Sequence, residues 1–132
     1  MIFVDTSAFL AILSTGDINH QGASLCWRNL IEEDQTLFTN NYVIVESIAL
    51  IQKRLGLEKV RDFQTKILAL LQIEWVDEAQ HITAIETVLQ ANRRKLSLID
   101  CSAYQTMNSR GINTVFTFDD HFREQGFNVI PD

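Results

Sequence analysis

Short apolar runs alternate with longer amphipathic segments along the whole chain. Runs rich in β-branched and aromatic residues predict strands, at Ile2–Val4, Thr36–Thr39, Ile73–Val76, Ile112–Phe118 and Asn128–Ile130. Apolar residues at helical spacing predict helices between them, at Ala8–Leu13, Asp17–Glu33, Tyr42–Leu55, Leu57–Leu71, Glu78–Asn92 and from a start marked by Ser97 to about Arg110. Strands that alternate with helices form right-handed βαβ units, so we predict an α/β fold with a central parallel sheet and helices on both faces.

Four acidic residues fall where such a fold would gather them. Asp5 follows the first strand and Asp119 the fourth, while Glu46 and Asp100 stand near the starts of helices that face the same edge. Each acid has an ordinary explanation: Asp5 as a helix cap, Glu46 as a complement to the helix dipole, and Asp100 in a capping box with Ser97. Ligands bind beyond the carboxyl ends of parallel strands, so four acids at that edge favour one shared site.

Clustered carboxylates repel one another and raise each other's pKa values unless a cation lies between them. All-oxygen ligation selects the hard ions Mg²⁺ or Mn²⁺ over zinc. Such ions act on phosphates by activating water and stabilising the leaving oxygen. The pattern therefore indicates metal-dependent hydrolysis of a phosphodiester.

Composition limits the remaining possibilities. A length of 132 residues suits one domain, and no apolar segment is long enough for a secretory signal or a membrane span. The two cysteines fit free thiols better than a disulfide framework, so we expect a cytoplasmic protein. A net charge of −6 opposes nucleic-acid binding, although basic residues are grouped at Lys53-Arg54 and Arg93-Arg94-Lys95.

The ordered set of motifs resembles a PIN-domain ribonuclease of the VapC toxin type, across the whole chain. The motifs are the opening Val-Asp-Thr-Ser, the Glu inside the helix after the second strand, Leu-Ser-Leu-Ile-Asp, and Thr-Phe-Asp-Asp-His-Phe near the end. The resemblance implies a single three-layer α/β/α domain over residues 1–132 that cleaves RNA with Mg²⁺ or Mn²⁺.

The resemblance also implies a role for each matching residue. Asp5, Glu46, Asp100 and Asp119 match the family's four acids, with Asp5 and Asp100 as the firmest metal ligands. Glu46 would ligate or orient water, and Asp119 would act at a second ion or through water. The hydroxyl residues expected to support the site are Thr6, Ser7 and Thr117. Asp120 is a fallback for Asp119, and His121 is expected to be a surface residue or to lie behind the ligands.

Partners follow from the same resemblance. Family members commonly form homodimers and are often held inactive by an antitoxin, and the apolar run Ile67–Leu71 is compatible with an interface, although core packing also explains it. The acidic balance leaves room for a small structured substrate such as a tRNA loop.

Two other classes of protein compete with this interpretation. A nucleophilic-Asp phosphatase requires a second Asp at the position of Ser7, and a receiver domain requires paired acids near the first strand and a Lys after the last. No Gly-rich phosphate loop is present. A PIN-like module that binds RNA or protein without cleaving it remains the alternative, and loss of one or more of the acids would favour it.

Overall fold

A parallel five-stranded sheet forms the centre of the protein; the computed structural model describes all of residues 1–132. The strands are β1 (Ile2–Val4), β2 (Leu37–Asn40), β3 (Gln72–Glu74), β4 (Thr114–Phe116) and β5 (Asn128–Ile130). Their order across the sheet is β3-β2-β1-β4-β5, and every neighbouring pair is parallel. All three residues of β1 are buried, as expected for the central strand of a sheet covered on both faces.

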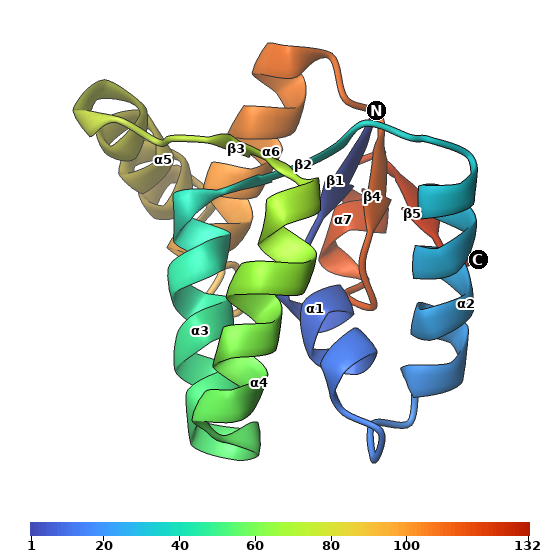
Figure 1. The fold of residues 1–132 in the computed structure, drawn as a ribbon. Helices are drawn as coiled ribbons and strands as arrows, with labels where there is room; N and C mark the ends of the chain where they lie inside the picture. The colour runs from blue at the N-terminus through green and yellow to red at the C-terminus, as the bar shows by residue number, and fades with distance from the viewer.

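Helices cover both faces of this sheet. They are α1 (Thr6–Leu13), α2 (His20–Glu32), α3 (Asn41–Leu55), α4 (Leu57–Asp62), α5 (Glu78–Ala91), α6 (Leu98–Arg110) and α7 (His121–Glu124). In Figure 1, α1 to α4 lie in front of the sheet and α5 to α7 behind it. The predicted three-layer α/β/α arrangement is confirmed. None of the helices is long and apolar enough to cross a membrane.

The direction of the chain across the sheet reverses between β1 and β4. The connection from β1 leads to β2 on one side, whereas the connection from β4 leads to β5 on the other. Because successive crossovers are right-handed, the two connections run over opposite faces. Ligands of such sheets bind beyond the carboxyl ends of the strands at this point, and the region beyond the ends of β1 and β4 is referred to as the crevice. This switch point is the place where Asp5 and the segment after Phe116 emerge.

Asn40 joins the two helical layers at the end of β2. Its side chain caps α3 by accepting a hydrogen bond from the Val43 N–H at 2.9 Å. Its amide donates to the hydroxyls of Ser102 and Thr106 on α6, at 3.3 and 3.1 Å. Asn40 is fully buried, so this polar link is shielded from water and fixes α6 against the start of α3.

The far end of α6 is also anchored. Arg110 donates two hydrogen bonds to Oε2 of Glu74 on β3, from Nε at 2.9 Å and from Nη2 at 2.5 Å. The same guanidinium lies 5.2 Å from the centre of the Phe38 ring. Gly111, with φ 69°, ends the helix in the left-handed conformation, which glycine adopts without steric cost.

The predicted helix Leu57–Leu71 is interrupted. After α4 the chain makes a π-helical turn over Phe63–Ile67 and a 3-10 turn over Leu68–Leu70. The wide π turn shifts the helical register by part of a turn, which lets Phe63, Ile67 and Leu68 all reach the core. Regular apolar spacing cannot reveal such a shift. Most of the apolar run is therefore core, and Leu70 alone among its large side chains is exposed.

Replacing Asn40 with Ala should lower the free energy of unfolding by about 2–3 kcal/mol, because it removes a helix cap and leaves buried hydroxyls short of a partner. Urea unfolding followed by circular dichroism measures this change. Asn29→Ala on the exposed side of α2 is the matched control, and its effect should stay within about 0.5 kcal/mol. Equal effects of the two substitutions would contradict the structural role assigned to Asn40.

Candidate active site

Asp5 lies at the end of β1 in the position of the N-cap of α1, yet its side chain makes no capping hydrogen bond. Its Oδ2 instead accepts hydrogen bonds from the hydroxyl of Thr117 at 2.9 Å and from that of Ser7 at 3.2 Å. The two hydroxyls are themselves 3.0 Å apart. Asp5 is 5% exposed, so a buried carboxylate is held here by side chains from two strand ends. The simple capping explanation of Asp5 is therefore wrong.

Asp100 occupies the first turn of α6 and forms the predicted capping box. Ser97 Oγ accepts from the Asp100 N–H at 3.0 Å, and Asp100 Oδ2 accepts from the Ser97 N–H at 3.1 Å. The reciprocal pair fixes the carboxylate relative to the helix axis. The capping box thus explains the position of Asp100 and occupies only its Oδ2, and Oδ1 makes no hydrogen bond.

Asp119 follows β4, which ends at Phe116 and so is shorter than predicted. After Thr117 the backbone N–H groups bond to side chains of the site instead of to a neighbouring strand. The Phe118 N–H donates to Ser7 Oγ at 2.9 Å, and the Asp119 N–H donates to Thr117 Oγ1 at 3.0 Å. Asp119 Oδ1 then accepts from the His121 N–H at 2.9 Å. This turn places the carboxylate at the mouth of the crevice and starts α7.

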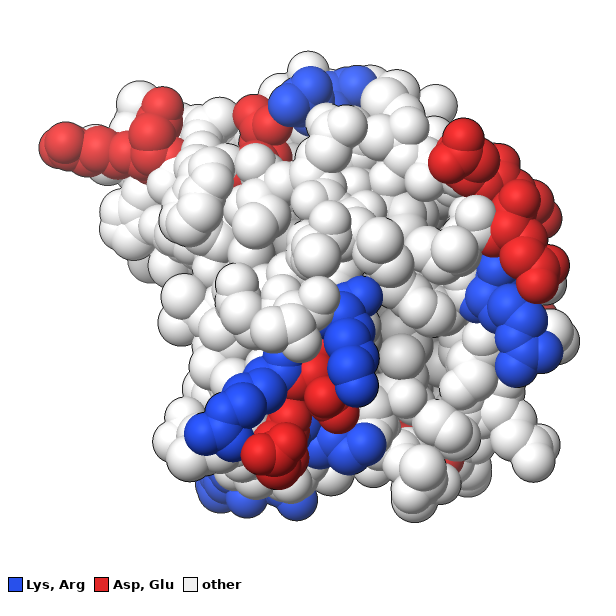
Figure 2. Space-filling model, in the orientation of Figure 1, with Lys and Arg blue, Asp and Glu red and all other residues white.

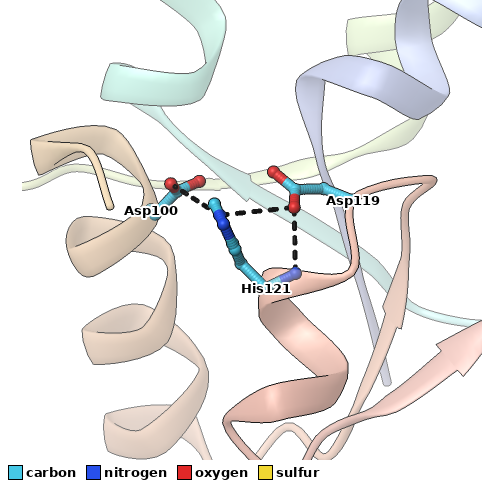
Figure 3. Close-up of side chains that lie close together, drawn as sticks. All are labelled: Asp100, Asp119 and His121. Carbon is cyan, nitrogen blue, oxygen red and sulfur yellow. Dashed lines mark hydrogen bonds and ion pairs between the residues drawn. The ribbon is translucent and has the colours of Figure 1, made fainter. Parts of the chain in front are cut away.

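His121 lies between two of the acids (Figure 3). Its Nδ1 is 3.6 Å from Asp100 Oδ2 and 3.4 Å from Asp119 Oδ1. One ligand atom from each of the three residues can be chosen so that all lie within 4.8 Å of one another. Nδ1 is buried and makes no hydrogen bond, which leaves it available to the site. We expected His121 at the surface or behind the ligands, whereas its ring lies between two of the acids.

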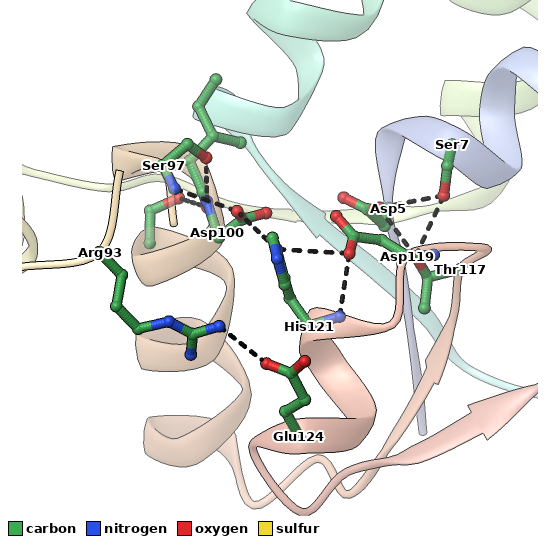
Figure 4. Close-up of polar contacts among 11 residues, drawn as sticks. Asp5, Ser7, Arg93, Ser97, Asp100, Thr117, Asp119, His121 and Glu124 are labelled. Atoms are coloured by element: carbon green, nitrogen blue, oxygen red, sulfur yellow. Dashed lines mark hydrogen bonds and ion pairs between the residues drawn. The ribbon is translucent and has the colours of Figure 1, made fainter. Parts of the chain in front are cut away.

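Each of the three aspartates uses one carboxylate oxygen for contacts within the protein. These oxygens are Oδ2 of Asp5, Oδ2 of Asp100 and Oδ1 of Asp119. The second oxygen of each residue makes no hydrogen bond. Figure 4 shows the three carboxylates with Ser7, Thr117 and Ser97, which hold them from different elements. One oxygen of each carboxylate is thus fixed by the protein, and the other is free to bind a ligand.

Glu46, Thr6 and Asp120, the other predicted site residues, lie outside the group of three aspartates. Glu46 is half-buried on α3 and makes no hydrogen bond or ion pair with the aspartates. The hydroxyl of Thr6 donates to the Val43 carbonyl at 3.5 Å and accepts from Ser47, the residue after Glu46, at 3.1 Å. Thr6 therefore joins α1 to the helix that carries Glu46. Asp120, the fallback for Asp119, is exposed and stands outside the cluster.

The pKa values of Asp5 and Tyr104 are both raised by burial and by nearby aspartates. Burial raises the pKa of Asp5 from its ordinary value of 3.8 to about 6, and the negative charge of Asp100 adds to the rise, against the hydrogen bond from Thr117. Burial also raises the pKa of Tyr104, and the charges of Asp100, Asp119 and Asp5 raise it further. The charges of all three aspartates therefore reach Tyr104, whereas the group whose ligand atoms lie within 4.8 Å of one another consists of Asp100, Asp119 and His121, without Asp5.

Comparisons with known proteins agree with this geometry. The family model for the PIN domain matches residues 2–128. The 23S rRNA-specific endonuclease VapC20 of Mycobacterium tuberculosis, from strains CDC 1551 and H37Rv, is 28% identical over 128 residues, which cover 96% of this chain and 95% of the relative.

Two solved structures share the fold. The crystal structure of M. tuberculosis VapC20, described as a sarcin-ricin loop cleaving toxin, superposes with a TM-score of 0.84 at 26% identity, covering 96% of both chains. FitAcB from Neisseria gonorrhoeae gives a TM-score of 0.70 at 19% identity, covering 98% of this chain and 96% of the other. The predicted fold is confirmed by both.

Asp5→Asn should stabilise the metal-free protein at neutral pH. Because the folded-state pKa of Asp5 is raised, the folded protein loses stability as the pH rises from 3.8 to about 6, and the loss is complete above that interval. Removing the charge should recover up to about 3 kcal/mol at neutral pH and much less below the interval.

Urea unfolding in the presence of a chelator, repeated across this pH range, measures the effect. Asp120→Asn is the matched control, since Asp120 is exposed, and its stability should follow that of the parent. An Asp5→Asn protein whose stability relative to the parent did not change with pH would contradict the assignment.

Proposed function

The chain belongs to the PIN-domain family, and from this membership we propose that it is an endoribonuclease that hydrolyses RNA phosphodiester bonds with Mg²⁺ or Mn²⁺. The observation that carries the proposal is the convergence of Asp5, Asp100 and Asp119 at the switch point of the sheet, each with one oxygen free. VapC20, which covers nearly the same length, is an rRNA endonuclease, and this supports RNA as the substrate class. Residues 1–132 would then form one PIN domain.

The donor set fits a hard divalent cation. Carboxylate oxygens predominate, and the His121 nitrogen at the edge of the cluster is compatible with Mn²⁺ as well as Mg²⁺. Asp5 and Asp100 would be the principal ligands, with Asp119 as a further ligand or a contact through water. Such a cation supplies the positive charge that activates water and stabilises the leaving oxygen of a phosphodiester.

The remaining residues would orient these groups. Thr117 and Ser7 hold one oxygen of Asp5 and so aim the other toward the crevice. Glu46 would orient water or complete the ligand set from α3, and Thr6 keeps that helix against α1. His121 would position Asp100 and Asp119, since its ring lies against both carboxylates.

The biological role is proposed on the same basis. Because VapC20 is described as a toxin, we assign this chain to the toxin component of a toxin–antitoxin pair that acts on a structured RNA such as an rRNA or tRNA loop. A cognate antitoxin covering the acidic crevice, assembly as a homodimer and a cytoplasmic location are further parts of this proposal. All four acids are retained, which favours a nuclease over a binding module that has lost its activity.

Asp100→Asn should reduce metal-dependent cleavage at least about 100-fold, because one ligand charge is lost while the capping geometry is retained. The measurement is cleavage of an RNA pool containing rRNA and tRNA with Mg²⁺, with Mn²⁺ and with chelator. Asp120→Asn should cleave as the parent does. Cleavage by the parent that persisted in chelator, or an Asp100→Asn protein as active as the parent, would overturn the proposal.

His121→Gln should weaken divalent-metal binding and cleavage about tenfold or more, since residues that orient ligands commonly contribute that much. Calorimetric titration with Mn²⁺ measures the affinity separately from activity. Arg123→Gln, on the same short helix, is the control and should change neither quantity. Unchanged affinity in His121→Gln would remove His121 from the site.

A further inference from the structure

A tight cationic turn joins α5 to α6. Asn92 ends α5 in the left-handed conformation with φ 49°, and the Leu96 N–H donates to the Arg93 carbonyl at 3.0 Å. This bond closes a β-turn whose two central residues are Arg94 and Lys95. Both side chains are exposed, and neither makes a hydrogen bond or an ion pair. The turn therefore presents two unpaired positive charges at its tip.

The turn is anchored on both sides. Leu96 is 5% exposed and packs into the core, while Arg93 Nη2 lies 3.0 Å from Glu124 Oε2 on α7. Figure 4 shows this ion pair close to the contact between His121 and Asp100. Both partners of the pair are about half exposed, so it adds little stability. Its effect is positional, because it fixes the turn to the helix that carries His121.

The tip of the turn is close to the site along the chain. Lys95 precedes Ser97 by two residues, and Ser97 and Asp100 are joined by the capping box. The Cα atoms of Lys95 and Asp100 are therefore within about 14 Å, from two chain steps and one helical turn. If an RNA strand passed over Asp100, the phosphates next to the scissile bond would lie within reach of a long side chain at position 95.

A hollow of about 330 Å³ lies beside the turn and gives room for a flanking nucleotide. Its lining combines apolar side chains with cations: Val88, Leu89, Asn92, Arg93, Arg94 and Leu96. Leu89 is 72% exposed and offers an apolar surface to a base, and Arg94, which also lines the hollow, is exposed and offers a charge to a phosphate. This combination suits single-stranded nucleic acid, in which bases and phosphates alternate.

The other group of basic residues differs in its surroundings. In Figure 2, Lys and Arg gather over the lower part of α3 and α4, with Asp and Glu among them. Two of these cations are paired within α4 and the turn after it, Arg61 with Glu58 at 2.8 Å and Lys66 with Asp62 at 3.2 Å. Lys53 and Arg54 are unpaired, but they lie at the end of α3 away from the capping box.

We propose that Arg94 and Lys95 bind phosphate groups of the RNA strand that flank the scissile bond, on the Asp100 side of the crevice. The inference rests on the proposed function. With a net charge of −6 and an acidic crevice, the protein as a whole repels RNA, so productive binding requires cations placed beside the site. The turn supplies them.

The test compares Arg94→Ala/Lys95→Ala with Lys53→Ala/Arg54→Ala, which removes the same two charges elsewhere. Binding of a short fluorescent RNA of mixed sequence is measured in chelator at several salt concentrations. The 94/95 variant should bind at least about fivefold more weakly, and its slope of log K against log salt should fall by up to about 1.4, roughly 0.7 for each lost contact. Arg94→Lys/Lys95→Arg should bind as the parent does.

Hydrolysis of bis(p-nitrophenyl) phosphate with Mn²⁺ separates this inference from the proposed function. A small diester does not reach the turn, so the 94/95 variant should hydrolyse it at the parental rate while cleaving long RNA more slowly. A parent inactive on both substrates would refute the proposed function itself. Unchanged RNA binding in the 94/95 variant, an equal loss in the 53/54 variant, or no RNA binding by the parent would overturn the inference.

Discussion

The hydrogen bonds that Thr117 and Ser7 donate to Asp5 are the interaction on which the site depends. A buried carboxylate beside a second negative charge is unfavourable, and it persists only where the surrounding structure fixes it. Thr117 follows β4 and Ser7 lies in the first turn of α1, so the bonds join the ends of the two central strands. The Phe118 N–H bond to Ser7 closes the same network. The site is therefore held together by contacts between segments that are more than 100 residues apart in the chain.

The sequence predicted the location of the site better than its internal geometry. Asp5 and Asp119 could be placed at one edge because the carboxyl ends of parallel strands coincide, a rule that needs no atomic detail. Asp100 could be placed at a helix start by its spacing from Ser97, and the structure shows that capping does not exclude it from the cluster, since the Oδ2 that accepts from the Ser97 N–H also lies 3.6 Å from His121 Nδ1. These inferences depend on the backbone alone.

What could not be predicted depends on side-chain orientation and on local helix geometry. The apolar neighbours of Glu46 indicated a helix, but periodicity does not give the direction of one carboxylate, and Glu46 makes no hydrogen bond or ion pair in the structure. The ring of His121 reaches Asp100 because α7 packs beside the start of α6, a tertiary relation with no sequence signal of its own. The π turn at Phe63–Ile67 brings Phe63, Ile67 and Leu68 to the core by a local change of helical register that apolar spacing does not reveal.

Helix α6 is held at three points along its length. The capping box fixes its first turn, Asn40 holds Ser102 and Thr106 in its middle, and Arg110 ties its last turn to the edge strand β3. Thirteen residues make a rod about 20 Å long, so the segment is stiff compared with the loops around it. A rod held at its start, middle and end cannot tilt at one end without breaking a contact at another. The direction of the Asp100 carboxylate is therefore set by the edge strand β3 and the buried Asn40 as well as by the capping box beside it.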